Sequence, residues 1–412
     1  MVHLDQAMNI AQTVLEELEK LIVDPSRIGV DTTDNKVISL SLRYCELTAF
    51  PASICQLPHL QQLDLTGNQL FTLPEALGQL TRLKKLVLDD NRLTALPETM
   101  GNLLELEELH VDVNQLTTLP ASVGRLGCLK RLSAYDNQLS SVPPSLGQLT
   151  HLRAISLGGN QLTALPAAFW QLTQLDSLNL AANQFSVIPE QIGNLTNLQM
   201  LDLAHNSLTV LPAALGRLTK LTHFLYLSNN RLTTLPPSLQ NLTNLRYLNL
   251  TDNQLTTLSD WIGKLTSLQE LRLYNNRLHT LPESLGNLTG LQELHVMKNE
   301  LISLPQSLGN LIHLKELGLS DNQLTALPTS IGKLTSLTRL DLRNNKLLSL
   351  PAALGNLSQL TWLDLRNNRF VALPAQISEL PQLEKLDLRW NKLAARPAWL
   401  QGLEQCGCTV YQ

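Results

Sequence analysis

A repeat runs through most of this 412-residue chain and constrains its fold more than any other feature. The stretch LTWLDLRNNRFVALP at residues 360–374 shows the unit, which reads LxxLxLxxNxLxxLP. Nearly the same string recurs from Val37 to Pro397 at a regular spacing. One repeat is as long as the step along the chain from Asn345 to Asn368. Self-similarity at a period in the twenties is typical of solenoids, in which each unit packs against its neighbours. The sequence therefore predicts one continuous repeat array.

One slot in the unit holds asparagine. It is filled by Cys45 in the first unit and then by Asn68, Asn91, Asn114, Asn137, Asn160, Asn183, Asn206, Asn230, Asn253, Asn276, Asn299, Asn322, Asn345, Asn368 and Asn391, which makes 16 units. Successive slots keep the same spacing except from Asn206 to Asn230, where the interval is one residue longer. This extra residue lies near His223, Phe224 and Leu225.

The two halves of the unit predict different local structures. In LDLR, Leu363 and Leu365 alternate with Asp364 and Arg366, as in a half-buried strand whose leucines face the core. The turn after the strand needs partners for its backbone groups, and asparagine offers two donors and an acceptor. The proline that opens the second half, for example Pro351, ends the preceding element and favours a short helical or 3₁₀ turn.

These motifs resemble the leucine-rich repeat family over about nine tenths of the chain. The LPxxLGxLTxL half is similar to the intracellular, Ras-scaffold-like and bacterial members of that family. The resemblance implies an α/β horseshoe with a parallel sheet on the concave face and short helical or 3₁₀ turns on the convex face. It also implies a non-catalytic module that binds a protein. We interpret Cys45, in the first asparagine slot, as structural.

Composition narrows the possible partners and the compartment. A net charge of −4 and a pI near 6.1 give no basic footprint for nucleic acid or an anionic membrane. The five cysteines are odd in number and scattered, which favours a reducing compartment. The first residues lack the pattern of a signal peptide, and no apolar run has membrane-spanning length. The sequence therefore favours a cytoplasmic protein.

The region 1–36 is expected to form a helical cap and a linker. Apolar residues recur at helical spacing in residues 3–22, at Leu4, Met8, Ala11, Val14, Leu15, Leu18 and Leu21. Such a helix can cover the exposed core of the first repeat. A helix that binds a partner or dimerises is the alternative. Residues 24–34 are expected to be a loop that leads into a first strand at 37–42.

The array is expected to span residues 37–397, with a C-terminal cap at 398–412. There the repeat pattern decays, and Trp399 and Leu400 are expected to cover the last repeat before a short edge strand. Cys406 and Cys408 form a CxC pair, which alone is weak evidence for a metal or redox site. We interpret both as structural cysteines.

The outward strand positions are the candidates for function. Small residues such as Ser156, Ser177 and Ala181 mark a stretch that a partner's backbone could approach. Beyond them lies a set of aromatic, methionine, arginine and histidine side chains, the types enriched at interface hot spots. The set comprises Met200, His223, Phe224, Tyr226, Arg246, Tyr247, Arg272, Tyr274, His295 and Met297.

This predicted patch coincides with two departures from the repeat, the extra residue near Phe224 and Ser259 in place of the usual proline. A binding patch is the interpretation we favour. The alternative is a harmless bulge, with tyrosines that are simply good strand residues.

The last units present Asp341, Asp364 and Asp387 in one outward column and Arg343, Arg366 and Arg389 in the next. We expect these opposite charges to form a solvated salt-bridge network. Beside them, Trp362 and Trp390 predict a second contact site, with Arg369 and Lys392, for an acidic segment of a partner.

The sequence shows no catalytic, cofactor or metal motif. No GxxxxGK precedes the GK pairs at Gly263 and Gly332, and there is no HExxH. The histidines are scattered singly. The prediction is therefore a monomeric scaffold or receptor module that binds a protein partner on its concave face, and not an enzyme. An architectural or self-associating solenoid without a fixed partner is the alternative.

Overall fold

The computed structural model describes residues 2–412, with side chains described from residue 11 onward. The side chains of Leu4 and Met8, which belong to the predicted apolar stripe, lie outside the described part. The chain forms two compact units. The first comprises the residues up to Ser186 together with Asn194–Leu201, and the second comprises Val187–Gly193 together with Asp202–Gln412.

The first unit begins with helix α1 (Val2–Leu21), a 3₁₀ helix η1 (Pro25–Arg27) and two strands, β1 (Gly29–Thr33) and β2 (Lys36–Ser41). Strands and 3₁₀ helices then alternate. The strands are β3 (Gln62–Asp64), β4 (Lys85–Val87), β5 (Glu108–His110), β6 (Arg131–Ser133), β7 (Ala154–Ser156) and β8 (Ser177–Asn179). The 3₁₀ helices are η2 (Ala52–Gln56), η3 (Glu75–Gln79), η4 (Glu98–Asn102), η5 (Ala121–Arg125), η6 (Pro144–Gln148) and η7 (Ala167–Gln171).

In sequence, η8 (Glu190–Asn194) and β9 (Met200–Asp202) fall at the change from one unit to the other. The strands of the second unit are β10 (Phe224–Tyr226), β11 (Tyr247–Asn249), β12 (Glu270–Arg272), β13 (Glu293–His295), β14 (Glu316–Gly318), β15 (Arg339–Asp341), β16 (Trp362–Asp364), β17 (Lys385–Asp387) and β18 (Thr409–Tyr411). Its 3₁₀ helices are η9 (Ala213–Arg217), η10 (Pro237–Asn241), η11 (Asp260–Lys264), η12 (Glu283–Asn287), η13 (Gln306–Asn310), η14 (Thr329–Lys333), η15 (Ala352–Asn356) and η16 (Ala375–Glu379), and the helix α2 (Leu400–Gln405) precedes the last strand.

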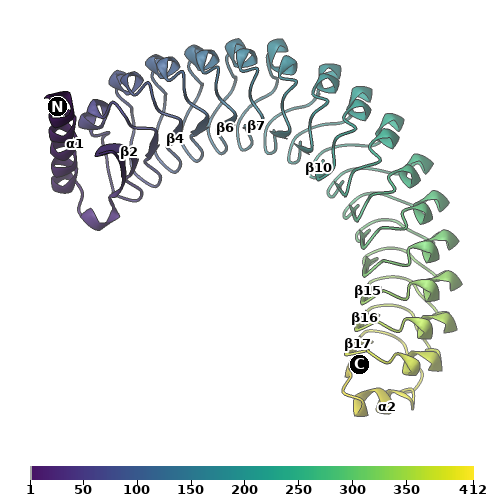
Figure 1. Cartoon of the computed structure of the whole chain (residues 1–412). Helices are drawn as coiled ribbons and strands as arrows, with labels where there is room; N and C mark the ends of the chain where they lie inside the picture. Colours follow the sequence, from purple (N-terminus) through teal and green to yellow (C-terminus); the bar gives the residue numbers. More distant parts are fainter. Residues whose placement is uncertain (1) are drawn as a thin grey trace. The chain divides into compact units, whose positions relative to one another are not determined.

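Each unit stacks its repeats in strict register. In the first unit Leu40, Leu63 and Leu86 pair on consecutive parallel strands, one repeat apart. In the second, Leu248 and Leu271 do the same. Within each unit the strands follow one side of the stack and the 3₁₀ helices the other (Figure 1). This arrangement confirms the predicted leucine-rich repeat solenoid with a parallel sheet and 3₁₀ turns.

The asparagine slot joins each repeat to the one before it. Asn276, for example, accepts a hydrogen bond on Oδ1 from the N–H of Leu255, at 3.0 Å. Its Nδ2 donates to the carbonyl of Leu250 at 2.9 Å and to that of Leu273 at 3.2 Å. The side chain therefore satisfies buried backbone groups in two repeats, as the sequence predicted. Cys45 in the first slot is buried, and its N–H donates to Asn68 Oδ1.

Helix α1 lies at the start of the array, where it packs against η2 and β2. Val14 and Leu18 are buried there, at 1% and 0% exposed. The N-terminal helix is therefore confirmed. Leu21, which the apolar stripe included, is instead exposed.

The loop predicted for residues 24–34 is wrong. This segment contains η1 and β1, and β1 pairs antiparallel with β2. Asp34 and Asn35 join the two strands with φ of 50° and 60°, the conformation of a two-residue type I′ hairpin turn. The Asp-Asn pair between two strand-like segments was the signal for this hairpin. By pairing with β2, strand β1 covers an edge that would otherwise be open.

At the other end, α2 buries Leu400 and Leu403, whereas Trp399 is only half-buried. The short strand β18 pairs parallel with β17. No helix within residues 2–412 is both long and apolar enough to cross a membrane. The division into cap, array and C-terminal cap at residues 36 and 397 stays a prediction.

The asparagine bonds allow a stability test. Replacing Asn276 with alanine leaves buried backbone groups in two repeats without partners, so we expect a loss of about 2–4 kcal/mol in the free energy of unfolding. Urea denaturation followed by circular dichroism measures the change. Asn310→Ala, at an exposed asparagine that ends η13, is the matched control and should shift the midpoint little. Equal shifts for the two variants would contradict the role of the slot.

Candidate protein-binding site

Three aromatic side chains meet on the sheet face of the second unit. Phe224 and Tyr226 lie on β10 and Tyr247 on β11, and we call these three residues the aromatic cluster. The rings of Phe224 and Tyr226 stack with centroids 5.5 Å apart. Tyr247 contacts Phe224 edge-on at 5.6 Å and Tyr226 at 5.1 Å. All three side chains are half-buried, so folding leaves part of their area accessible.

Strand register brings these rings together. Phe224 pairs with Tyr247 across the parallel strands β10 and β11, while Leu225 and Leu248 between them point into the core. Alternation along β10 then returns Tyr226 to the same face as Phe224. The cluster therefore follows from the repeat pattern, because the register of the strands places aromatic residues at three neighbouring outward positions.

Charged neighbours hold one side of the aromatic cluster. The guanidinium of Arg272 lies over the ring of Tyr247, 5.7 Å from its centroid, and also pairs with the carboxylate of Glu270. Burial raises the pKa of Tyr247 to about 12, and the positive charge of Arg272 opposes this only in part. The Tyr247 hydroxyl is therefore neutral at physiological pH and acts as a hydrogen-bonding group rather than a base.

The extra residue of the irregular repeat falls just before β10. Thr222 and His223 lie in this segment, with the hydroxyl of Thr222 3.0 Å from Nδ1 of His223. His223 is exposed, and its ring centroid is 6.2 Å from that of Phe224. Arg246 is exposed just before β11. The insertion thus adds an accessible histidine beside the aromatic cluster.

Ser259 does not belong to this surface. It directly precedes η11, and the 3₁₀ helices lie on the side of the stack away from the strands (Figure 1). Ser259 is near the patch in the chain but not in space. Only one of the two irregularities therefore bears on the aromatic cluster.

A pocket lies further along the same unit, on strands β13 to β16. Its volume is about 200 Å³, and it is lined by His295, Met297, Glu316, Leu317, Gly318, Arg339, Asp341 and Trp362. Arg339 lies over the ring of Trp362, 5.1 Å from its centroid. A Cβ atom on Gly318 would clash with the sulfur of Met297. Glycine at this outward position therefore leaves room for the methionine.

The structure divides the predicted patch. His295 and Met297 line the pocket with Trp362, which the sequence analysis had placed in the second site with Trp390. Trp390 is 68% exposed and lines a different pocket near the C-terminus. Tyr274 contacts Lys298, whose nitrogen lies 5.1 Å from the ring centroid. Trp362 and Trp390 therefore line separate pockets, and their shared contact site stays a prediction.

Met200 belongs to the first unit. It lines a groove of about 310 Å³ there, whose wall includes the small residues Ser133, Ala154, Ser156 and Ser177. Of the small residues singled out in the sequence, Ser156 and Ser177 line this groove, and Ala181 does not.

The charge ladder near the C-terminal end forms ion pairs. Arg366 pairs with Asp364 at 2.5 Å and with Asp387 at 3.4 Å, and Arg389 pairs with Asp387 at 2.7 Å. The two aspartates are about 1% exposed, so the network is less solvated than predicted. Burial raises the pKa of Asp387, but hydrogen bonds from Arg389 outweigh it and leave the pKa below its usual value.

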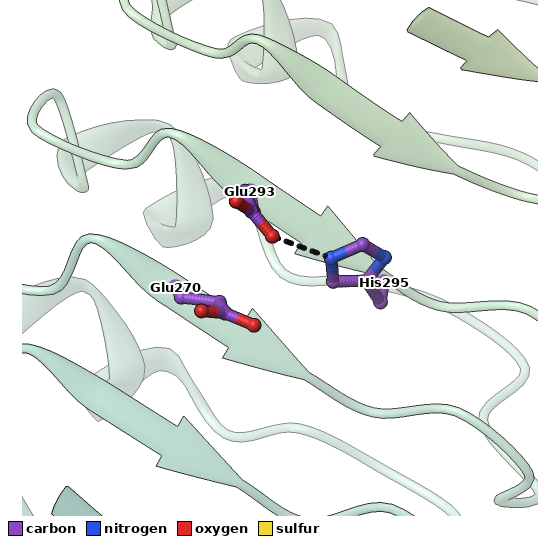
Figure 2. A group of neighbouring side chains, drawn as sticks. All are labelled: Glu270, Glu293 and His295. Atoms are coloured by element: carbon purple, nitrogen blue, oxygen red, sulfur yellow. Dashed lines mark hydrogen bonds and ion pairs between the residues drawn. The ribbon is translucent and has the colours of Figure 1, made fainter.

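Sequence reasoning missed the carboxylates of this surface. Glu270, Glu293 and Glu316 occupy the same outward position on consecutive strands. Of the described side chains, one group could hold a metal ion, and it consists of Glu270, Glu293 and His295 (Figure 2). A single glutamate at an outward strand position is common and indicates nothing. The sequence signal for these carboxylates was that glutamate recurs at the same position of successive repeats.

Comparison with known proteins gives one consistent result. A profile described as leucine-rich repeat region matches residues 38–133, 167–245, 236–311 and 302–405, and a second leucine-rich repeat profile matches residues 128–185. Among curated proteins, none matches significantly.

Solved structures provide relatives of known architecture. A leucine-rich repeat protein of Leptospira interrogans is 36% identical, with a TM-score of 0.84, over 90% of this chain and 95% of its own. A plant peptide hormone receptor in complex with RGF2 is 33% identical, with a TM-score of 0.77, over 88% of this chain and 61% of its own. YopM of Yersinia enterocolitica is 27% identical, with a TM-score of 0.60, over 94% of this chain and 92% of its own.

The raised pKa of Tyr247 makes a prediction for alkaline pH. The unfolded tyrosine loses its proton near pH 10 and the folded one near pH 12, so this group stabilises the fold below pH 10 and that contribution is lost between pH 10 and 12. Because the side chain is half-exposed, we expect a loss of only about 1 kcal/mol. Urea midpoints of the wild type and Tyr247→Phe should therefore fall by different amounts over this range, the wild type more. Parallel curves would contradict the shift.

Proposed function

The chain belongs to the leucine-rich repeat family, and from this premise we propose that it is a non-catalytic scaffold or receptor module that binds a protein partner. The partner lies on the concave sheet face of the second unit, with the aromatic cluster as its anchor. Phe224, Tyr226 and Tyr247 form the core of the contact, and His223 and Arg272 flank it.

The observation that carries this proposal is the accessible area of the three rings. Other aromatic side chains of this leucine-packed solenoid, such as Phe169 and Phe370, lie in the core. The aromatic cluster instead lies on the outward face and is held by ring contacts. Preordered aromatic rings lose little side-chain entropy on binding, which is why tyrosine is enriched at interface hot spots.

The solved relatives support a protein or peptide as the partner. The plant receptor that is 33% identical to this chain was solved in complex with RGF2. This chain spans about three fifths of that receptor's length. The aromatic cluster, the pocket with Trp362 and the strand face between them belong to one unit. They offer an extended surface, which suits a polypeptide better than a small metabolite.

The chemistry of the surface favours binding over catalysis. The phenol of Tyr247 titrates near pH 12, Glu270 is paired with Arg272, and Asp341 lies within the ion-pair ladder. General acid–base catalysis needs groups that titrate near the working pH. We therefore assign these side chains to contact and orientation of the partner.

We also propose that the protein works as a monomer in the cytoplasm. Its five cysteines are all free, which fits a reducing compartment. Burial raises the pKa of Cys45, Cys55 and Cys408, so these thiols are less reactive than exposed ones. The net charge of −4 argues against nucleic acid as the partner.

Affinity capture from lysate of the source cells tests the proposal. The wild type is expected to retain a partner that the triple variant Phe224→Ala, Tyr226→Ala, Tyr247→Ala loses. Removing two or three hot-spot rings costs about 4 kcal/mol or more, which is about a thousandfold in affinity. Mass spectrometry identifies the captured proteins. Circular dichroism and the urea midpoint of the variant show whether the fold is retained.

Two further variants separate the possible outcomes. Tyr135→Ala removes an exposed tyrosine from the first unit and should leave capture unchanged. Leu248→Ala, at a position 1% exposed, should cost about 2–5 kcal/mol of stability without changing the surface. If the triple variant keeps its fold and captures the same proteins as the wild type, the aromatic cluster is not the anchor. An altered oligomeric state would favour the architectural alternative.

A further inference from the structure

We propose that Glu270, Glu293 and His295 form a binding site for one divalent metal ion of the Zn²⁺ class. The three side chains come from two neighbouring strands, β12 and β13, and converge on the sheet face (Figure 2). Their ligand atoms all lie within 4.8 Å of one another. Small rotations of the two glutamate side chains would bring these atoms to the spacing that one shared ion needs.

Strand register fixes this arrangement. Glu270 pairs with Glu293 across β12 and β13, so the two carboxylates leave adjacent backbones on the same face. His295 follows Glu293 by two residues and therefore points the same way. Its Nε2 atom lies 3.0 Å from the carboxylate of Glu293. The backbone of a packed sheet thus holds all three ligands, as a preorganised metal site requires.

The donor set selects the type of ion. The imidazole of His295 suits Zn²⁺, which also accepts carboxylate ligands, whereas Ca²⁺ and Mg²⁺ are bound through oxygen ligands. Three protein ligands leave a further position on the ion for water or for a group from a partner. The side chains are partly exposed, at 21% for Glu270, 38% for Glu293 and 17% for His295, so an ion can reach them.

The electrostatics of the column favour a bound cation. Glu316 lies opposite Glu293 in the strand register on the other side, so three carboxylates stand in line on β12, β13 and β14. Like charges directly opposite one another on a sheet are destabilising. Arg272 offsets one of them through its ion pair with Glu270. A divalent ion would neutralise the remaining charge where it is most concentrated.

The chain contains a natural contrast to this site. Strand β5 carries the same Glu-Leu-His sequence, with Glu108 and His110 in the positions of Glu293 and His295. There the flanking strands present Lys85 and Arg131 instead of glutamates. Lys85 pairs with Glu108 at 3.0 Å, so that carboxylate is already neutralised. The two identical strands therefore differ in their neighbours, and of the two only β13 has a carboxylate at each side.

Isothermal titration calorimetry with ZnCl₂ at pH 7.5 and physiological salt tests the proposal on the full chain. We expect the wild type to bind one ion that Glu293→Gln and His295→Ala each weaken by about 100-fold or more, since even loss of a supporting residue costs about 10- to 100-fold. His110→Ala, in the equivalent position of the first unit, is the matched control and should bind as the wild type does. Equal binding by all four proteins would place the ion elsewhere and overturn the site.

A second test exchanges the residues that flank the two Glu-Leu-His strands, β13 and β5, and leaves both of these strands unchanged. Glu270→Lys copies the residue found at position 85, so it should fold and abolish the binding. The double variant Lys85→Glu, Arg131→Glu should create a second site at Glu108 and His110 and raise the stoichiometry to about two ions per chain. Unchanged binding in Glu270→Lys would contradict the assignment of this carboxylate, and thermal melts without zinc would show whether that variant is folded.

Discussion

The hydrogen bonds of the asparagine slot are the interaction on which the rest of this structure depends. A turn that follows a buried strand leaves backbone groups that water cannot reach, and Asn276 satisfies three of them with one side chain. Two of these groups belong to the preceding repeat. Packing of leucines explains why repeats attract one another, but these bonds fix their spacing and register. Every surface feature of the protein follows from that register, because it decides which outward side chains become neighbours.

The fold was predictable from the sequence because its signals are periodic. The spacing of leucine, asparagine and proline gave the strands, the turns and the unit length, and many repeats carried the same information. Signals that occur once were missed or misread. Asp34 and Asn35 form a hairpin turn that a search for repeats overlooks, and Ser259 lies near the patch in sequence but on the other side of the stack. A sequence feature that occurs only once can be interpreted only from the residue preferences of local turns or from its position in the three-dimensional structure.

The surface was predictable only in part, because its important contacts connect residues one repeat apart. Phe224, Tyr226 and Tyr247 were chosen by residue type, and register then brought them together. Trp362 was grouped with Trp390 because both lie beside the charge columns, and the structure adds Met297 and Arg339 as its neighbours. Glu293 is recognisable as part of a charged column only once the strand register places Glu270 and Glu316 on either side of it. Reading the sequence as aligned columns, rather than along the chain, would have revealed these sets.

The asparagine bonds also give the array a direction with consequences for its evolution. Each slot reaches back to the repeat before it, as Asn68 does to Cys45 and Asn276 does to Leu255. A duplication or deletion of one whole repeat leaves every such bond with a partner, and even the extra residue before β10 keeps them, since the N–H of Leu208 still donates to Asn230 Oδ1. Recombination can therefore lengthen or shorten the protein in steps of one whole repeat at little cost to stability. One repeat inserted between β11 and β12 would move the aromatic cluster away from Glu270 and Arg272. Ligand specificity can therefore change through the distance between two groups of contact residues, while the residues themselves stay the same.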